Sequence, residues 1–107
     1  MKIAIPSDDG ILVGTQFRCS RAFYVVTVNA GKITRQELRW NLLSEILTSP
    51  HGFYYNLCDC DIILLQEHEN GLGEALKAKG KTVSYTCQTL VNQAVKNFLS
   101  PLSVHPK

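Results

Sequence analysis

The chain has 107 residues, of which 45% are apolar and 19% charged, and its formal net charge at pH 7 is +2. That length suits a single domain with its own core, and the apolar fraction excludes a disordered chain. No run reaches the ~20 consecutive apolar residues of a membrane span, and the scattered basic residues give no argument for nucleic acid. We therefore expect one soluble, cytoplasmic domain over residues 1–107, with neither a membrane nor a nucleic-acid partner.

The first half of the chain predicts three strands. Residues 2–6 form a short apolar strand, and a loop of more than ten residues follows it. Residues 22–28 form a continuous apolar run, typical of a strand buried on both faces. A tight turn over 29–31 leads to a third strand over 32–40, whose polarity indicates a sheet edge. Strict alternation would place Thr34, Gln36, Leu38 and Trp40 on one face of that strand, and Ile33, Arg35, Glu37 and Arg39 on the other.

The second half alternates helices and strands. Ser49 and Pro50 predict a helix from 50 to about 57, and residues 61–66 read as a buried strand. A helix follows with Leu72, Ala75 and Leu76 on one face and Gly80 as its C-terminal stop. Residues 82–85 form the last strand and 89–99 the last helix, and we expect residues 100–107 to be a loose tail.

This order of elements predicts an α/β fold. A hairpin followed by right-handed crossovers gives a five-stranded mixed sheet in the order 3-2-1-4-5, with the second strand antiparallel and helices on both faces. The winding direction reverses between strands 1 and 4. Ligands of open α/β sheets bind at such a point, outside the carboxyl ends of the strands.

The four cysteines are the compositional feature that raises a functional question, and we expect free thiols because the chain shows no secretory signal. Cys19 follows the first strand, His68 the fourth and Cys87 the fifth, while His51 begins the helix reached from the third. All four lie at the carboxyl edge. Cys58 and Cys60 belong to the opposite edge, where burial is the favoured interpretation.

Six segments spread over nearly the whole chain carry a resemblance to a known family: residues 2–6, residues 21–24, His51–Gly52, residues 61–64, residues 71–73 and residues 91–99. Through their order and spacing the chain resembles the dinitrogenase iron-molybdenum cofactor biosynthesis family. It implies a ribonuclease H-like three-layer fold in the small single-domain form of the family. It also implies a protein that binds or carries metal-sulfur clusters or cofactor precursors.

Two segments depart from the family pattern. The family shows His-Phe-Gly-Arg-Ala before the second strand, whereas here residues 18–20, Arg-Cys-Ser, precede the matching Arg21 and Ala22. A shifted register pairs residues 16–17 with the His-Phe, and the histidine is absent in both registers. Either Cys19 replaces that histidine as a softer ligand, or the function is lost. The turn after the fourth strand is more acidic than usual, which points to a different metal or a different ligand.

Each candidate ligand can also be explained by a structural role that involves no metal. Cys19 lies between Arg18 and Arg21, which favour a thiolate that binds soft metals, but it also fits a plain loop thiol. Cys87 opens the last helix beside apolar neighbours, and packing is the favoured interpretation. Two acidic residues, Asp8 and Asp9, could serve metal-dependent nuclease chemistry on a ribonuclease H-like fold. Their position in a turn after the first strand is the better explanation for the two carboxylates.

We therefore expect a non-enzymatic accessory protein that binds an iron-molybdenum-type or other metal-sulfur cluster, or a cofactor precursor. Its ligands would be Cys19, His51, His68 and Cys87, with loop support from Arg18, Ser20, Arg21 and Gly71. A protein partner in cofactor assembly is compatible with that role. The alternatives are a scaffold module that has lost the cluster site and a hydrolase on the same fold.

Overall fold

The computed structural model describes residues 1–15, 17, 20–40, 57, 59–66 and 71–99. The elements are β1 (Lys2–Pro6), β2 (Ala22–Asn29), β3 (Lys32–Trp40), β4 (Ile62–Leu65), α2 (Leu72–Ala78), β5 (Thr82–Tyr85) and α3 (Val91–Leu99). The helix expected from 50 to about 57 and the tail expected over 100–107 lie outside the described residues, apart from Leu57. None of the described helices is long and apolar enough to cross a membrane.

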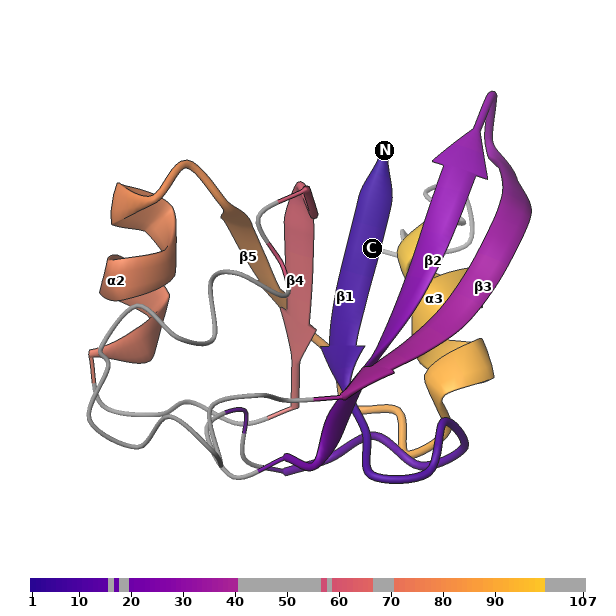
Figure 1. The fold of residues 1–107 in the computed structure, drawn as a ribbon, viewed down its shortest axis with the longest axis horizontal. Helices are drawn as coiled ribbons and strands as arrows, with labels where there is room; N and C mark the ends of the chain where they lie inside the picture. The colour runs from indigo at the N-terminus through magenta and orange to yellow at the C-terminus, as the bar shows by residue number, and fades with distance from the viewer. Residues whose placement is uncertain (16, 18–19, 41–56, 58, 67–70, 100–107) are drawn as a thin grey trace, which may run out of the picture.

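The five strands form one mixed sheet in the order β3-β2-β1-β4-β5, as predicted (Figure 1). β2 is antiparallel to both of its neighbours, whereas β1, β4 and β5 run parallel to one another. The chain therefore winds outward in one direction through the hairpin and in the other direction through β4 and β5. The point of reversal lies beside the central strand β1.

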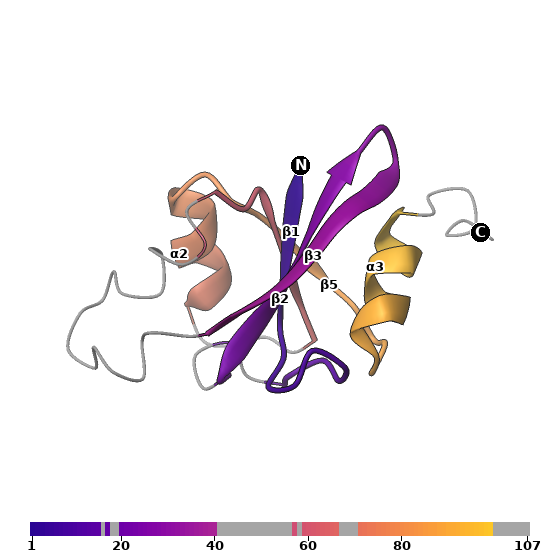
Figure 2. The ribbon, with the colours of Figure 1, turned by 45° about the vertical axis from the view of Figure 1, so that its right-hand side comes forward.

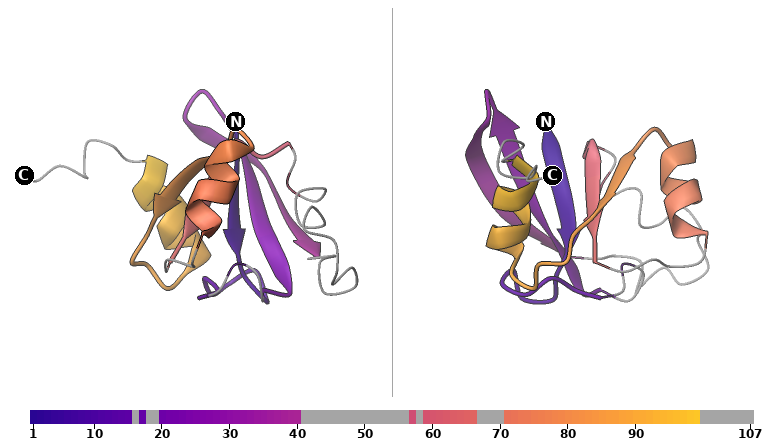
Figure 3. Two further views of the ribbon diagram at one scale, coloured as in Figure 1. Left: turned by 90° about the vertical axis from the view of Figure 1, so that its left-hand side faces the viewer. Right: turned by 180° about the vertical axis from the view of Figure 1, so that it is seen from behind.

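Alternating apolar residues give the sheet two buried faces, each covered by one of the described helices (Figures 2 and 3). The α3-side cluster takes Ile3, Ile5 and Leu64 from the sheet and packs them against Val91, Ala94 and Val95. The α2-side cluster takes Ala4, Val25 and Ile63 from the opposite face and packs them against Leu72 and Leu76. The prediction of helices on both faces is confirmed.

The helix ends follow from local backbone chemistry. Gly80, with φ of 84°, takes the left-handed conformation just beyond the end of α2, as its predicted role as a stop requires. The start of α3 differs from the prediction, since the helix begins at Val91 and not at residue 89. Leu90 instead forms an antiparallel bridge with Leu12 through the hydrogen bonds of its neighbours Thr89 and Val91, and its carbonyl accepts from the amide of Ala94 in α3 over 2.9 Å.

The β2–β3 hairpin corrects the predicted faces of β3. Thr27 pairs with Arg35 but Val28 pairs with Ile33, so Thr34 is an extra residue in β3. This bulge reverses the alternation beyond it. Ile33 therefore shares the face of Val28, which belongs to the α3-side cluster, and not the face of Arg35 as strict alternation predicted.

Candidate functional site

The described parts of the loops after β1 and β5 meet at the carboxyl edge of the sheet, at the bottom of Figure 1, where β4 also ends. These two loops are joined by backbone hydrogen bonds. The amide of Val13 donates to the carbonyl of Thr89 over 2.8 Å, and the amide of Val91 donates to the carbonyl of Ile11 over 2.9 Å. Gln66, just after β4, donates from Nε2 to the carbonyl of Gln88 over 3.0 Å. Hydrogen bonds therefore link the loops after β1 and β5 and join Gln66, at the end of β4, to the second of them.

Ser7 and Asp9 shape the turn that opens the β1–β2 loop. The Ser7 hydroxyl donates to the carbonyl of Leu12 over 2.6 Å and accepts from the amide of Gly10 over 2.8 Å. Asp9 Oδ1 accepts from the amides of Ile11 and Leu12 over 2.8 and 3.0 Å. These backbone amides hold the pKa of Asp9 below its usual value. The predicted turn role of this carboxylate is confirmed.

A second set of contacts closes the base of the same loop. Asp8 Oδ1 accepts from the amide of Arg21 over 2.7 Å, and the Ser20 hydroxyl donates to the carbonyl of Ala22 over 2.8 Å. A Cβ at Gly14 would lie 3.3 Å from the carbonyl oxygen of Pro6, so this close approach favours glycine. The two limbs of the loop are thus held together at its base.

Phe17 anchors the far part of the loop in the core. Its side chain is 1% exposed, and its ring centroid lies 4.9 Å from that of Phe23. The amide of Ser20 donates to the carbonyl of Phe17 over 3.4 Å. The residues on either side of Arg18 and Cys19 are therefore fixed by burial and by hydrogen bonds.

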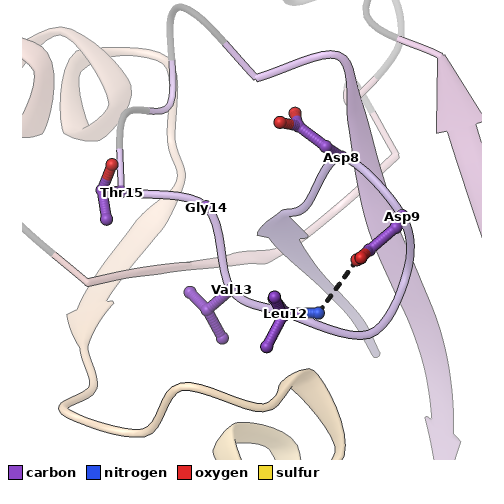
Figure 4. A pocket seen from close by; sticks show the side chains of 6 residues that line it. All are labelled: Asp8, Asp9, Leu12, Val13, Gly14 and Thr15. Carbon is purple, nitrogen blue, oxygen red and sulfur yellow. Dashed lines mark hydrogen bonds between the residues drawn. The ribbon is translucent and has the colours of Figure 1, made fainter.

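The limb of this loop from Asp8 to Thr15 curves round a pocket of about 290 Å³, with Asp8 and Thr15 on opposite sides (Figure 4). The lining residues are Asp8, Asp9, Leu12, Val13, Gly14 and Thr15. The carboxylates give the pocket acceptor chemistry, but one oxygen of each already accepts a backbone amide. The pocket therefore has polar side chains at both ends, Asp8 and Asp9 at one and Thr15 at the other, with Leu12 and Val13 between them.

Half of the predicted site residues fall within the described structure. Cys87 is exposed in the loop between β5 and α3, so the interpretations that it opens the helix and is packed are both wrong. Ser20 is buried beside the loop base, Arg21 is exposed, and Gly71, with φ of 73°, precedes α2. The others lie outside the described residues: Arg18, Cys19, His51 and His68. Within the described part of the chain, no group of three His, Cys, Asp or Glu side chains could hold a metal ion.

Cys60 lies just before β4, at the opposite edge, and is buried in the α2-side cluster as predicted. Loss of hydration raises the pKa of its thiol to about 12, so the thiol is neutral at physiological pH. Its predicted companion, Cys58, lies outside the described residues. The buried, neutral form of Cys60 is the state of a structural thiol and not of a soft-metal ligand.

Sequence reasoning missed two residues that organise the site. Ser7 is fully buried, and its hydroxyl makes hydrogen bonds on both sides of the first turn. Gln66 joins the loops after β4 and β5. The run Ser7–Asp8–Asp9 signals a turn, but only the folded loop shows that Ser7 lies on its inside. Nothing in the sequence pairs Gln66 with Gln88.

The chain matches no family model and no curated protein. Its structure is similar to that of PH0822, with a TM-score of 0.78 and 20% identity over 94% of this chain and 92% of that one. It is similar to a "putative dinitrogenase" from Methanocaldococcus jannaschii, with a TM-score of 0.74 and 14% identity over 94% and 89%. It is also similar to the apo form of the orange protein from Desulfovibrio gigas, with a TM-score of 0.74 and 25% identity over 94% and 88%. The resemblance indicated by the sequence is therefore confirmed: the chain has the fold of the dinitrogenase iron-molybdenum cofactor biosynthesis family.

Proposed function

We propose that this protein is a non-enzymatic, cytoplasmic accessory protein, a single domain that binds or carries a metal-sulfur cluster or a cofactor precursor. The cargo would be an iron-molybdenum-type or an iron-sulfur-type cluster. The protein would hold it at the carboxyl edge through Cys19, His51, His68 and Cys87. A partner protein in cofactor assembly would deliver or receive the cargo.

The observation that carries this proposal is the linked set of loops at one edge of the sheet. The loop after β5 presents the exposed thiol of Cys87, and it is bonded to the loop after β1, in which Cys19 lies. Solved structures with the same fold include the apo form of the orange protein and the "putative dinitrogenase" from Methanocaldococcus jannaschii. Thiolates are the ligands that soft metals and iron-sulfur clusters prefer.

The basic residues beside Cys19 give the site its electrostatic role. Arg18 and Arg21 flank this cysteine in sequence, and a neighbouring positive charge lowers a thiol pKa and favours the thiolate. Ser20 and Gly71 would support the loops, since Ser20 closes the base of the first loop and Gly71 supplies the left-handed turn before α2.

Anaerobic reconstitution tests the proposal directly. The chain is incubated with sulfide and either iron or thiomolybdate, desalted, and analysed by visible absorption and metal content. We expect bound metal and a charge-transfer band in the wild type, and a loss of both in Cys19→Ser and Cys87→Ser. Cys60→Ala is the matched control, because that buried thiol lies at the opposite edge. A wild type that binds no metal, or unchanged binding in Cys19→Ser, contradicts the ligand assignment.

The second candidate is a scaffold module that keeps the fold without the cluster site. It is favoured by the missing family histidine before β2, where Arg18, Cys19 and Ser20 stand. A stable protein that takes up no metal but retains one partner reproducibly in pull-down experiments would support it. A hydrolase is the third candidate, and a null result in a metal-supplemented nuclease assay would remove it.

A further inference from the structure

Two exposed leucines lie side by side where the loop after β1 meets the loop before α3. Backbone hydrogen bonds on either side of the Leu12–Leu90 bridge make these two residues a non-hydrogen-bonded antiparallel pair. The side chains of such a pair lie close together on one face of the two chains. Leu12 and Leu90 are 53% and 41% exposed, whereas the next residues, Val13 and Val91, are buried in the α3-side cluster. The leucine pair is therefore an exposed apolar surface directly above buried core.

The same leucine pair borders two carboxylates, because Leu12 also lines the pocket that Asp8 and Asp9 enter (Figure 4). Asp8 Oδ1 accepts the amide of Arg21, and Asp9 Oδ1 accepts two amides of its own turn. Within the described part of the chain, no basic side chain forms an ion pair with either carboxylate. The amide donors hold the pKa of Asp9 below its usual value, so Asp9 is negatively charged at neutral pH. The second oxygen of each carboxylate is open to a donor from outside.

The backbone that carries these side chains is fixed before any partner arrives. The Ser7 hydroxyl and the Asp9 carboxylate hold the turn, and the bridge ties the loop to the segment that leads into α3. A pre-organised surface loses little conformational entropy when it binds. An apolar centre bordered by polar groups is also the usual composition of a protein–protein interface, whereas single exposed apolar residues are ordinary.

We propose that this docking surface, formed by Asp8, Asp9, Leu12 and Leu90, binds a segment of a partner protein in which a lysine or arginine stands beside apolar side chains. The basic side chain enters the pocket and donates to the open carboxylate oxygens. The apolar side chains of the segment cover the leucine pair.

Charge selects this occupant over two others. An acidic segment would bring like charges together at the pocket, which costs affinity. A second copy of the chain, docked symmetrically, would place the same surface on itself and so oppose Asp8 and Asp9 to their own copies. A basic and apolar segment meets neither penalty, and it supplies the cation that the two carboxylates lack within the described residues.

The docking surface lies at the carboxyl edge, in the same linked loops as the exposed Cys87. A partner held there stands beside the candidate cluster site, as delivery or receipt of a cargo requires. That link to cargo transfer rests on the proposed function. The docking itself does not depend on it, and its test uses the protein without metal.

Peptide titration followed by amide chemical shifts tests the docking. Two synthetic peptides of equal length, with Leu-Lys-Leu and Leu-Glu-Leu at their centres, are added separately to the isotope-labelled chain. We expect saturable shifts at residues 9–14 and 89–92 with the lysine peptide. Its dissociation constant should be at least about tenfold lower than that of the glutamate peptide, because only the lysine complements the pocket.

Variants separate the contribution of charge from that of apolar contact. Asp8→Asn combined with Asp9→Asn keeps oxygens that accept the backbone amides but removes both charges, so binding of the lysine peptide should weaken about tenfold. Leu90→Ser should weaken both peptides. Ile33→Ser and Glu74→Gln are the matched controls, because they remove an exposed apolar residue and an exposed carboxylate elsewhere. Their dissociation constants should stay within about twofold of the wild type.

The proposal is overturned if the lysine peptide causes no saturable shifts, if both peptides bind equally, or if the controls weaken binding as much as the surface variants. Shifts at residues 9–14 that depend on protein concentration without any peptide would show that a second copy covers the surface, and would overturn it too. Peptide binding without metal uptake contradicts the proposed function alone. Metal uptake without peptide binding contradicts the docking surface alone.

Discussion

At the scale of single residues, Ala30 carries the clearest backbone strain. It is the one non-glycine residue with positive φ in the described part of the chain, at 52°, and Gly31 follows at 80°. Two successive positive φ values between antiparallel strands define the turn that Asn-Gly fits best. A Cβ in the left-handed region costs roughly 1–2 kcal/mol, and asparagine tolerates that region better than alanine.

Ala30→Asn should therefore raise the free energy of unfolding by about 0.5–1 kcal/mol, as measured by urea denaturation. Ala30→Val should lower it, because a β-branched side chain fits this conformation worst. Equal stability of the two variants would contradict the assignment of strain to this residue.

Asp59 carries the clearest pH-dependent contribution to stability. Its carboxylate accepts from Arg39 Nη1 over 2.7 Å and from Lys2 Nζ over 2.9 Å, and the Arg39 guanidinium is the main reason that the pKa of Asp59 is well below its usual value. A depressed folded-state pKa stabilises the protein fully above the unfolded value of about 3.9, and that stabilisation is lost as pH falls toward the folded value.

Asp59→Asn should consequently lower the free energy of unfolding by about 1 kcal/mol at pH 7, the upper range for a solvent-exposed ion pair. The difference from the wild type should shrink as pH falls below about 4. Chemical denaturation at several pH values measures it.

At the scale of elements, the first turn of the β1–β2 loop depends on one buried hydroxyl. Ser7→Ala would leave the carbonyl of Leu12 and the amide of Gly10 without this partner. The expected cost is about 1–3 kcal/mol, with faster hydrogen exchange at residues 10–13. Thr15→Ala, at an exposed position of the same loop, should change stability by less than about 0.5 kcal/mol. Equal effects of the two substitutions would show that the Ser7 hydroxyl is not needed.

The elements also show what sequence patterns reveal and what they do not. The buried runs 22–28 and 62–65 predict central strands because both of their faces are apolar. The bulge at Thr34 depends on cross-strand register, which the alternation within β3 does not contain. Likewise the Leu12–Leu90 bridge is a contact between distant loops, and neither this bridge nor the exposure of Cys87 can be read from the local sequence pattern. The meeting of the loops after β1 and β5 at one edge was predictable from topology, but the hydrogen bonds that join these loops were not.

At the scale of the whole molecule, the sheet separates two clusters that share no side chains. Leu76→Ala should cost about 2–5 kcal/mol through the α2-side cluster, and Val95→Ala should cost less because it removes fewer atoms from the α3-side cluster. The double variant should lose the sum of the two within about 0.5 kcal/mol, because the sites have no common neighbours. A double-mutant cycle measures the coupling, and a larger value would show that strain passes through the sheet.

The central position of β1 has a kinetic consequence. β1 pairs with β2 after a short excursion of the chain, but its contacts with β4 join distant residues, as in the hydrogen bond from the amide of Lys2 to Asp61, 59 positions apart. Closing a longer loop costs more conformational entropy, and this cost comes before the contacts between the loop ends contribute any favourable free energy. We expect the antiparallel half of the sheet, β1-β2-β3, to gain amide protection first during refolding. The parallel strands β4 and β5 should pair with β1 afterwards. Pulse-labelling hydrogen exchange would reveal that order, with β4 and β5 acquiring protection last.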